Sequence, residues 1–296
     1  MMLKNFGQME RFVREQSGKK RVALAAAHDA DALGSLMMAV DRGIAEAILI
    51  GRRKEIVRVL DEMGKDAGDF RIIEEEDDRA AADKAVELVH CGEADMPMKG
   101  LMHTSTFMKA ILDKEKGLKE EGNLLSQASV FEIPEKDRFL IISDCAVNID
   151  PDLETKIKIT ENAAALAHTL GIEQPKIAVL SAVEVVNPKI RSTVDAAAMR
   201  ERLSDRYLID GPLALDNAID EAAAHHKGIE SPVAGNADIL IVPDLWSGNI
   251  FSKGLVFFAH LRSAGTLNGL KAPVVMSSRT DTVENKYLSI LTAVLQ

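Results

Sequence analysis

The five residues Ser277-Ser278-Arg279-Thr280-Asp281 bring hydroxyl groups, a guanidinium and a carboxylate into one short segment near the C-terminus. An apolar run over 273–277 leads into it, and a helical pattern over about 282–295 follows. Asp281 with Glu284 three residues later resembles a capping box. Such groups at the mouth of a helix, where backbone N–H groups are free, suit hydrogen bonding to a dianionic oxyanion. The alternative is a capped surface loop with an exposed arginine.

A second segment whose residues could take part in binding or catalysis is Met98–Thr106. Its short strand ends in Lys99-Gly100, and a hydroxyl-rich stretch then caps a predicted helix. His103 could act there as a general base, although a single histidine is more often a cap or a packed side chain.

A third segment, 243–249, follows the apolar run ADILIV. Gly248 permits close approach of a backbone, and Asn249 is a good helix N-cap. Lys253 follows one turn into the predicted helix. A plain strand-to-helix loop is the alternative.

A fourth segment, Ser143–Asn148, ends the run RFLII and contains one of the two cysteines. Cys145 invites a nucleophile hypothesis, but no Lys, Arg or His stands next to it in sequence to lower the pKa of its thiol. A buried structural thiol is therefore favoured, and Asp144 and Asn148 are better candidates for lining a cleft.

These segments need a scaffold in which strands alternate with helices. Strands are expected at 21–27, 45–50, 70–74, 138–143, 176–181, 237–242 and 273–277, and helices at 30–42, 78–91, 153–170, 213–226, 250–263 and 282–295. The alternation predicts an α/β fold with parallel sheets, in which ligands bind beyond the carboxyl ends of the strands. Asn148–Asp152 is the expected boundary between two domains.

The composition excludes several classes of protein. Net charge is −10, with 36 Lys and Arg against 46 Asp and Glu, and 4% of residues are aromatic, so neither a basic footprint nor a stacking platform for nucleic acid is expected. No apolar run reaches membrane-spanning length, and residues 1–6 lack the apolar region of a signal peptide. With two distant cysteines, a reduced cytoplasmic location is expected. No P-loop, dinucleotide fingerprint or H-E-x-x-H motif occurs.

Six segments in order together resemble the phosphate acetyl/butyryltransferase family over nearly the whole chain. They are MKGLMHTSTFMKAIL (98–112), SDCAVNIDPDL (143–153), KIAVLSAVEVVNPKIRSTVDAAAM (176–199), IDGPLALDNAI (209–219), SPVAGNADILIVPDLWSGNIFSKGL (231–255) and PVVMSSRTDTVENKYLSI (273–290).

The resemblance implies a two-domain α/β fold like that of isocitrate and isopropylmalate dehydrogenases, with mostly parallel sheets flanked by helices and an interdomain cleft. The first domain would comprise residues 1–149 plus 276–296, and the second 150–275. It also implies a homodimer and direct acyl transfer in a ternary complex: acyl-CoA plus phosphate gives acyl phosphate plus coenzyme A. The resemblance implies no catalytic metal. No tightly bound cofactor is expected either, because coenzyme A is a substrate.

By the same resemblance, Arg279 would hold the phosphate and Ser278 would hydrogen-bond the thiolate or the tetrahedral intermediate. Asp281 fits the Ser-Arg-x-Asp pattern of the butyryl branch and is a candidate base beside Glu284. The acetyl branch has its proposed base, an aspartate, at the position of Asn285. The rest of the cleft would be lined by Lys99, Gly100, His103, Thr104, Asp144, Asn148, Asp210, Gly211, Pro212, Gly248, Asn249 and Lys253.

Four other activities stay open at this point. The first is a phosphate acetyltransferase proper, and the second is a metal- and NAD(P)-dependent decarboxylating dehydrogenase of the same fold. The third is a longer-chain phosphate acyltransferase, and the fourth is a regulatory protein that binds coenzyme A or phosphate without catalysis. The acyl chain is not set by the sequence, since a pocket discriminates a methylene by only about 1–3 kcal/mol.

Overall fold

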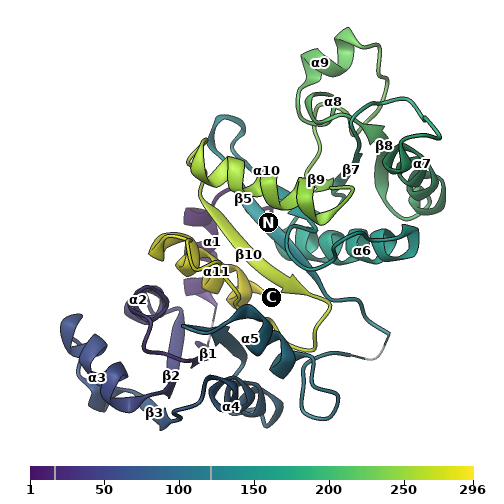
Figure 1. Cartoon of the computed structure of the whole chain (residues 1–296). Helices are drawn as coiled ribbons and strands as arrows, with labels where there is room; N and C mark the ends of the chain where they lie inside the picture. Colours follow the sequence, from purple (N-terminus) through teal and green to yellow (C-terminus); the bar gives the residue numbers. More distant parts are fainter. Residues whose placement is uncertain (17, 121) are drawn as a thin grey trace. The chain divides into compact units, whose positions relative to one another are not determined.

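Apolar strands alternate with helices along the chain, and the strands form two sheets in two separate units (Figure 1). The structure, a computed structural model, describes residues 1–16, 18–120 and 122–296. The terminal unit comprises Phe6–Asn123 and Ala264–Gln296, and the middle unit comprises Met1–Asn5 and Leu124–Ser263.

The terminal unit contains a four-stranded sheet of order β3-β2-β1-β4, with every neighbouring pair parallel. Parallel pairing follows from the crossover helices between its strands. The elements are α1 (Phe6–Glu15), β1 (Lys20–Ala25), α2 (Ala30–Asp41), β2 (Ala45–Gly51), α3 (Arg53–Glu62), a 3-10 turn (Ala67–Asp69), β3 (Arg71–Glu74), α4 (Asp78–His90), β4 (Met96–Lys99), α5 (Thr104–Ile111) and α11 (Val283–Leu295). α11 packs on α1 and α2, and α4 packs on α5 and on the sheet.

The middle unit contains strands in the order β5-β6-β9-β7-β8. β5 and β6 form an antiparallel hairpin, and the other neighbouring pairs are parallel. The elements are β5 (Ser126–Ile133), a 3-10 turn (Pro134–Lys136), β6 (Arg138–Ser143), α6 (Leu153–Thr169), β7 (Lys176–Leu180), α7 (Arg191–Leu203), β8 (Leu208–Leu213), α8 (Leu215–Ile219), α9 (Glu221–His226), β9 (Ile239–Ile241) and α10 (Leu245–Phe257). β10 (Ser263–Asn268) begins at the boundary with the terminal unit.

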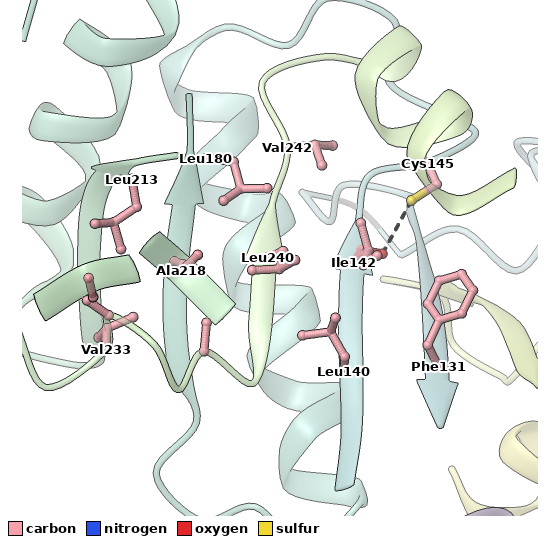
Figure 2. Packing of buried hydrophobic residues seen from close by; sticks show 14 residues of the cluster. Phe131, Leu140, Ile142, Cys145, Leu180, Leu213, Ala218, Val233, Leu240 and Val242 are labelled. Atoms are coloured by element: carbon pink, nitrogen blue, oxygen red, sulfur yellow. Dashed lines mark hydrogen bonds between the residues drawn. The ribbon is translucent and has the colours of Figure 1, made fainter. Parts of the chain in front are cut away.

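The central strands β6, β7 and β9 of the middle unit are apolar on both faces, as covered parallel strands are. Leu140 and Ile142 of β6 point into one core cluster with Leu240 of β9, as Figure 2 shows. The alternate residue Ile141 is also fully buried but lies outside this cluster. Two helices of the middle unit, α6 and α10, begin at aspartate N-caps. Asp152 accepts from the N–H of Thr155 at 2.8 Å, and Asp244 accepts from that of Ser247 at 2.8 Å.

The unit boundaries lie earlier in the chain than the expected 149/150 and 275/276. The β5–β6 hairpin accounts for the first of these two differences. Because β5 pairs with β6 along its length, the chain has entered the middle unit's sheet well before the turn at Asn148–Asp152.

The predicted mixed α/β architecture, with parallel sheets flanked by helices, is confirmed, and several individual elements differ. The strand expected at 273–277 consists only of isolated bridges at Val274 and Val275. The helix expected at 213–226 is divided into α8 and α9 around Asp220, which caps α9. The helix expected at 250–263 begins at Leu245, because Asp244 and not Asn249 is its N-cap. Within the described ranges, no helix is both long and apolar enough to cross a membrane.

Candidate active site

The Ser278–Asp281 turn in the terminal unit is organised by its own carboxylate. The Asp281 side chain accepts from the Ser278 N–H at 2.7 Å, and the Asp281 N–H donates to the Ser278 carbonyl at 3.2 Å. The expected capping box at Asp281 is wrong, because the N-cap of α11 is Thr282, whose hydroxyl accepts from the Asn285 N–H at 3.1 Å. Asp281 therefore closes the turn that precedes the helix.

This turn presents its polar groups to solvent. Ser278, Arg279 and Thr280 are exposed, and the hydroxyls of Ser278 and Thr280 lie 3.1 Å apart. A guanidinium and two hydroxyls on an exposed turn can meet the oxygen atoms of an anion from several directions.

Arg279 is oriented by the loop that follows β4. Its Nη2 donates to the Met102 carbonyl at 3.2 Å and lies 3.4 Å from Nδ1 of His103. Since a guanidinium only donates, this ring nitrogen is the acceptor, and the neutral ring carries its proton on Nε2. Thr104 is the first residue of α5, and His103 precedes it as an N-cap without a side-chain cap bond.

Lys99 and Gly100 enter the same place from the end of β4. Lys99 is only 5% exposed, and its Nζ donates to the carbonyls of Gly100 and Met102, each at 3.3 Å. Burial lowers the pKa of the Lys99 ammonium, and the positive charges of Arg279 and Lys286 lower it further, while Asp29 opposes them. Gly100 is required by space, because a Cβ there would lie 2.3 Å from the Ala26 carbonyl oxygen.

Lys286 is a site residue that the sequence reasoning did not single out. It lies in the first turns of α11, is 3% exposed, and donates through Nζ to the Arg279 carbonyl at 3.4 Å and to the Asp281 carbonyl. It thereby ties the Ser278–Asp281 turn to the helix behind it. Its position on the same helical face as Val283 and Ile290 was the available signal, because a lysine on an apolar face must be buried with its own partners.

In the middle unit, Asp144 and Asn148 form a closed hydrogen-bond network. The Asp144 carboxylate accepts from the N–H groups of Ala146 and Val147 at 2.8 and 2.9 Å and from the Asn148 amide at 2.6 Å. Asp144 is 3% exposed. Its side chain therefore shapes the loop after β6.

Gly248 and Asn249 lie in α10 against this loop. A Cβ at Gly248 would lie 2.5 Å from the Asp144 carbonyl oxygen, and the Asn249 amide donates to the Cys145 carbonyl at 3.1 Å. Cys145 itself is buried, donates through its thiol to the Ile142 carbonyl at 3.5 Å (Figure 2), and has its pKa raised to about 12 by burial. These properties fit the favoured structural thiol.

Asp210, Gly211 and Pro212 lie on β8, apart from that loop. Asp210 accepts from the N–H of Gly211 at 2.8 Å and from Arg200 at 3.3 Å, and a Cβ at Gly211 would lie 2.8 Å from the Val179 carbonyl oxygen. Asp210 also lines a cavity of about 810 Å³ beside α7. Lys253 is exposed on α10.

The structure thus brings together Ser278, Arg279, Asp281, Lys99, Gly100 and His103 within the terminal unit, and Asp144, Asn148, Gly248 and Asn249 within the middle unit. Across the described part of the chain, no three His, Cys, Asp or Glu side chains gather where they could hold a metal ion.

Comparison with known proteins gives a consistent result. A family model described as phosphate acetyl/butaryl transferase matches residues 80–294. The chain is 46% identical to a phosphate butyryltransferase of Clostridium acetobutylicum, over 99% of this chain and 98% of that protein. It is 42% identical to a phosphate acetyltransferase of Thermotoga maritima, over 95% and 97%. The crystal structure of a branched-chain phosphotransacylase from Enterococcus faecalis V583 matches with a TM-score of 0.83 and 34% identity, over 93% of this chain and 98% of that one.

Proposed function

The chain belongs to the phosphate acetyl/butyryl transferase family, and from this premise we propose how its residues carry out acyl transfer between coenzyme A and inorganic phosphate. The reaction is acyl-CoA plus phosphate to acyl phosphate plus coenzyme A. The supporting observation is the exposed Ser278–Arg279 turn, which is held against the loop after β4 by the Arg279 bond to Met102.

Arg279 binds the phosphate and offsets charge on its oxygen atoms as the acyl group is transferred. Its bonds to Met102 and His103 come from one edge of the guanidinium through Nη2, so the group is oriented before the anion arrives. Ser278 donates its hydroxyl to the thiolate or to the tetrahedral intermediate. Asp281 and Lys286 hold the turn that presents both groups.

The loop after β4 supplies the floor of the same site. Gly100 lets the chain pass against β1, and the exposed Thr104 and His103 stand at the start of α5, where free N–H groups favour an anion. Lys99 adds a positive charge when it is protonated.

The middle unit contributes the other wall of an interdomain cleft in this proposal, as in the dehydrogenase-like fold that the sequence resembles. Its contributing residues are Asp144, Asn148, Asp210, Gly211, Pro212, Gly248, Asn249 and Lys253. Support comes from the tightly bonded loop around Asp144, since rigid loops at the carboxyl ends of strands are where open α/β sheets bind ligands.

The acyl group that is transferred is proposed to be short or branched. Support comes from the butyryltransferase and branched-chain phosphotransacylase relatives, while the 42% identity to an acetyltransferase favours acetyl transfer as the second candidate. No tightly bound cofactor is part of the proposal, and a cytoplasmic location remains an expectation.

A homodimer through α10 is also part of the proposal. Phe251 and Leu255 of this helix pack on the core cluster, whereas Trp246, Ile250 and Phe257 are 58%, 71% and 53% exposed. A helix that is apolar on two faces needs a second partner, and a copy of the same helix is the simplest one.

Thiol release from acetyl-, butyryl- and isobutyryl-CoA, measured with and without phosphate, tests the function. The expected result is release that depends on phosphate and forms an acyl phosphate, fastest with one of the two four-carbon thioesters. Release independent of phosphate would indicate a thioesterase and reject the proposal.

A further inference from the structure

We propose that Lys99 is the group that takes the proton from the thiol of coenzyme A and passes it to the departing phosphate. This inference rests on the proposed function and names a catalytic residue for it. The question is open because an amide, Asn285, occupies the position at which the acetyl branch has its proposed base, and an amide cannot accept a proton at neutral pH.

The position of Lys99 carries the proposal. The Met102 carbonyl oxygen accepts from both Lys99 Nζ and Arg279 Nη2, at 3.3 and 3.2 Å. The amine is therefore within two hydrogen-bond lengths of the guanidinium that binds the phosphate. A thiol that attacks the acyl carbon attached to this phosphate must approach the same place.

The surroundings of Lys99 favour its neutral form. Its Nζ is bonded to two backbone carbonyls, and no salt bridge to it is found among the described residues. The charged groups that face it are Arg279, Lys286 on α11 and Asp29 at the start of α2. Burial lowers the pKa of the amine, and two cations against one carboxylate lower it further, so that Lys99 loses its proton more readily than an exposed lysine does.

Two other candidates for the base, Asp281 and His103, are engaged by neighbouring residues of the site. The Asp281 carboxylate closes its own turn by accepting the Ser278 N–H at 2.7 Å. His103 accepts from Arg279 through Nδ1, so its neutral ring carries the proton on Nε2 and keeps no lone pair for a substrate.

The step balances with the established reactants alone. The thiol sulfur forms a bond to the acyl carbon, and its proton moves to the neutral amine of Lys99. The bond between the acyl carbon and the phosphate oxygen breaks, and its electron pair leaves with the phosphate. Lys99 then gives the proton to that phosphate, so that the products are acyl-CoA and hydrogen phosphate.

Three variants measured in the direction from acyl phosphate and coenzyme A test the proposal. Lys99→Met and Lys99→Arg should each lower kcat by about 10²- to 10⁴-fold, the usual contribution of a general base. Lys99→Arg is the informative one, because it keeps the positive charge but cannot accept a proton. Lys109→Met, at an exposed lysine of α5, is the matched control and should leave kcat unchanged.

Two further readouts separate proton transfer from a structural role. The kcat of the wild-type protein should rise with pH as Lys99 loses its proton, and this limb should be absent from the Lys99 variants. In Lys99→Ala, added primary amines should restore turnover, with rates that increase with the pKa of the free amine. Coenzyme A binding by calorimetry should stay within about threefold in every variant, since the base acts mainly in the transition state.

Full activity in Lys99→Arg, or rescue that does not depend on the pKa of the amine, would overturn the assignment. Failure of the wild-type protein to release thiol in a phosphate-dependent manner would instead reject the proposed function. The two failures are therefore distinguishable.

Discussion

Arg279 and the lysines around it differ in how they meet solvent. Arg279 is exposed at the tip of its turn, while Lys99 and Lys286 are 5% and 3% exposed. The exposed guanidinium can bind and release an anion, whereas the buried amines are bonded to backbone carbonyls and fix the loops that carry it. In the proposed site Arg279 binds the anion and Lys286 positions the turn, while Lys99 both anchors its loop and is placed to exchange a proton.

Arg279→Ala should therefore affect phosphate more than acyl-CoA. We expect a higher KM for phosphate and a loss of about 2–4 kcal/mol in transition-state stabilisation, seen as a fall in kcat/KM. Arg58→Ala, which removes an exposed arginine paired with Glu62 on α3, is the control. An unchanged kcat/KM in Arg279→Ala would remove this residue from the site.

Cys145 should be dispensable for chemistry. Its thiol is buried and its pKa is raised to about 12, so almost no thiolate forms at pH 8. Cys145→Ala should keep kcat/KM within about threefold, and iodoacetamide at pH 8 should label the exposed Cys91 first. Prompt inactivation with label on Cys145 would contradict this.

At the scale of single residues, the sequence predicted which residue types could bind an anion but did not predict their hydrogen-bond partners. The exposed Ser278–Arg279 pair could be found from its position after an apolar run. The burial of Lys286 could be predicted from the apolar face of its helix, but its two acceptors could not, because backbone carbonyls of a turn leave no trace in the spacing of side chains.

At the scale of helices and strands, local hydrogen bonds can override what the spacing of residue types in the sequence predicts. Asp281 and Glu284 have the spacing of a capping box, yet α11 begins one residue later, because Asp281 is used by the turn and Thr282 is free to cap. Three strands, β5, β8 and β10, were not among those expected, and two of them show why. β5 is half polar in sequence and is fixed by pairing with β6, and β8 contains Gly211-Pro212, which usually argue against a strand.

Thr282→Ala should lower the free energy of unfolding of the terminal unit by about 1 kcal/mol, because the first turn of α11 loses its cap. Urea unfolding measures this change. Glu284→Gln is the matched control and should have little effect, since Glu284 is exposed and outside the observed cap. A larger loss of stability in Glu284→Gln than in Thr282→Ala would instead support a capping box formed by Asp281 and Glu284.

At the scale of the whole molecule, α10 carries an apolar surface that stays exposed among the described residues. Ile250, Trp246 and Phe257 recur at helical spacing along α10, and Lys253 lies among them. Most of the two-sheet architecture could be predicted from the alternation of strands and helices. The exposed apolar stripe on α10 could not be predicted, because the sequence of an apolar helix indicates burial in both cases, whether the helix packs on its own chain or on a second copy.

Ile250→Glu should convert the proposed dimer to a monomer, because a carboxylate at the centre of an apolar contact must be desolvated without a partner. Sedimentation velocity measures the change. Leu112→Glu alters a less exposed apolar residue at the end of α5 and should leave the sedimentation coefficient as in the wild type. A wild-type protein that sediments as a monomer would reject the proposed interface.

The divided terminal unit has a consequence for biosynthesis. Residues Asn285–Val294 of α11 are all buried, and they pack on α1 and α2, which leave the ribosome long before them. While the middle unit is made, the nascent terminal unit must therefore keep an uncovered apolar surface on α1 and α2. Ser278 and Arg279 also emerge only after the middle unit is complete. With the proposed site, the protein would gain activity only after its translation is complete, and a chaperone that shields apolar surface would act in this interval.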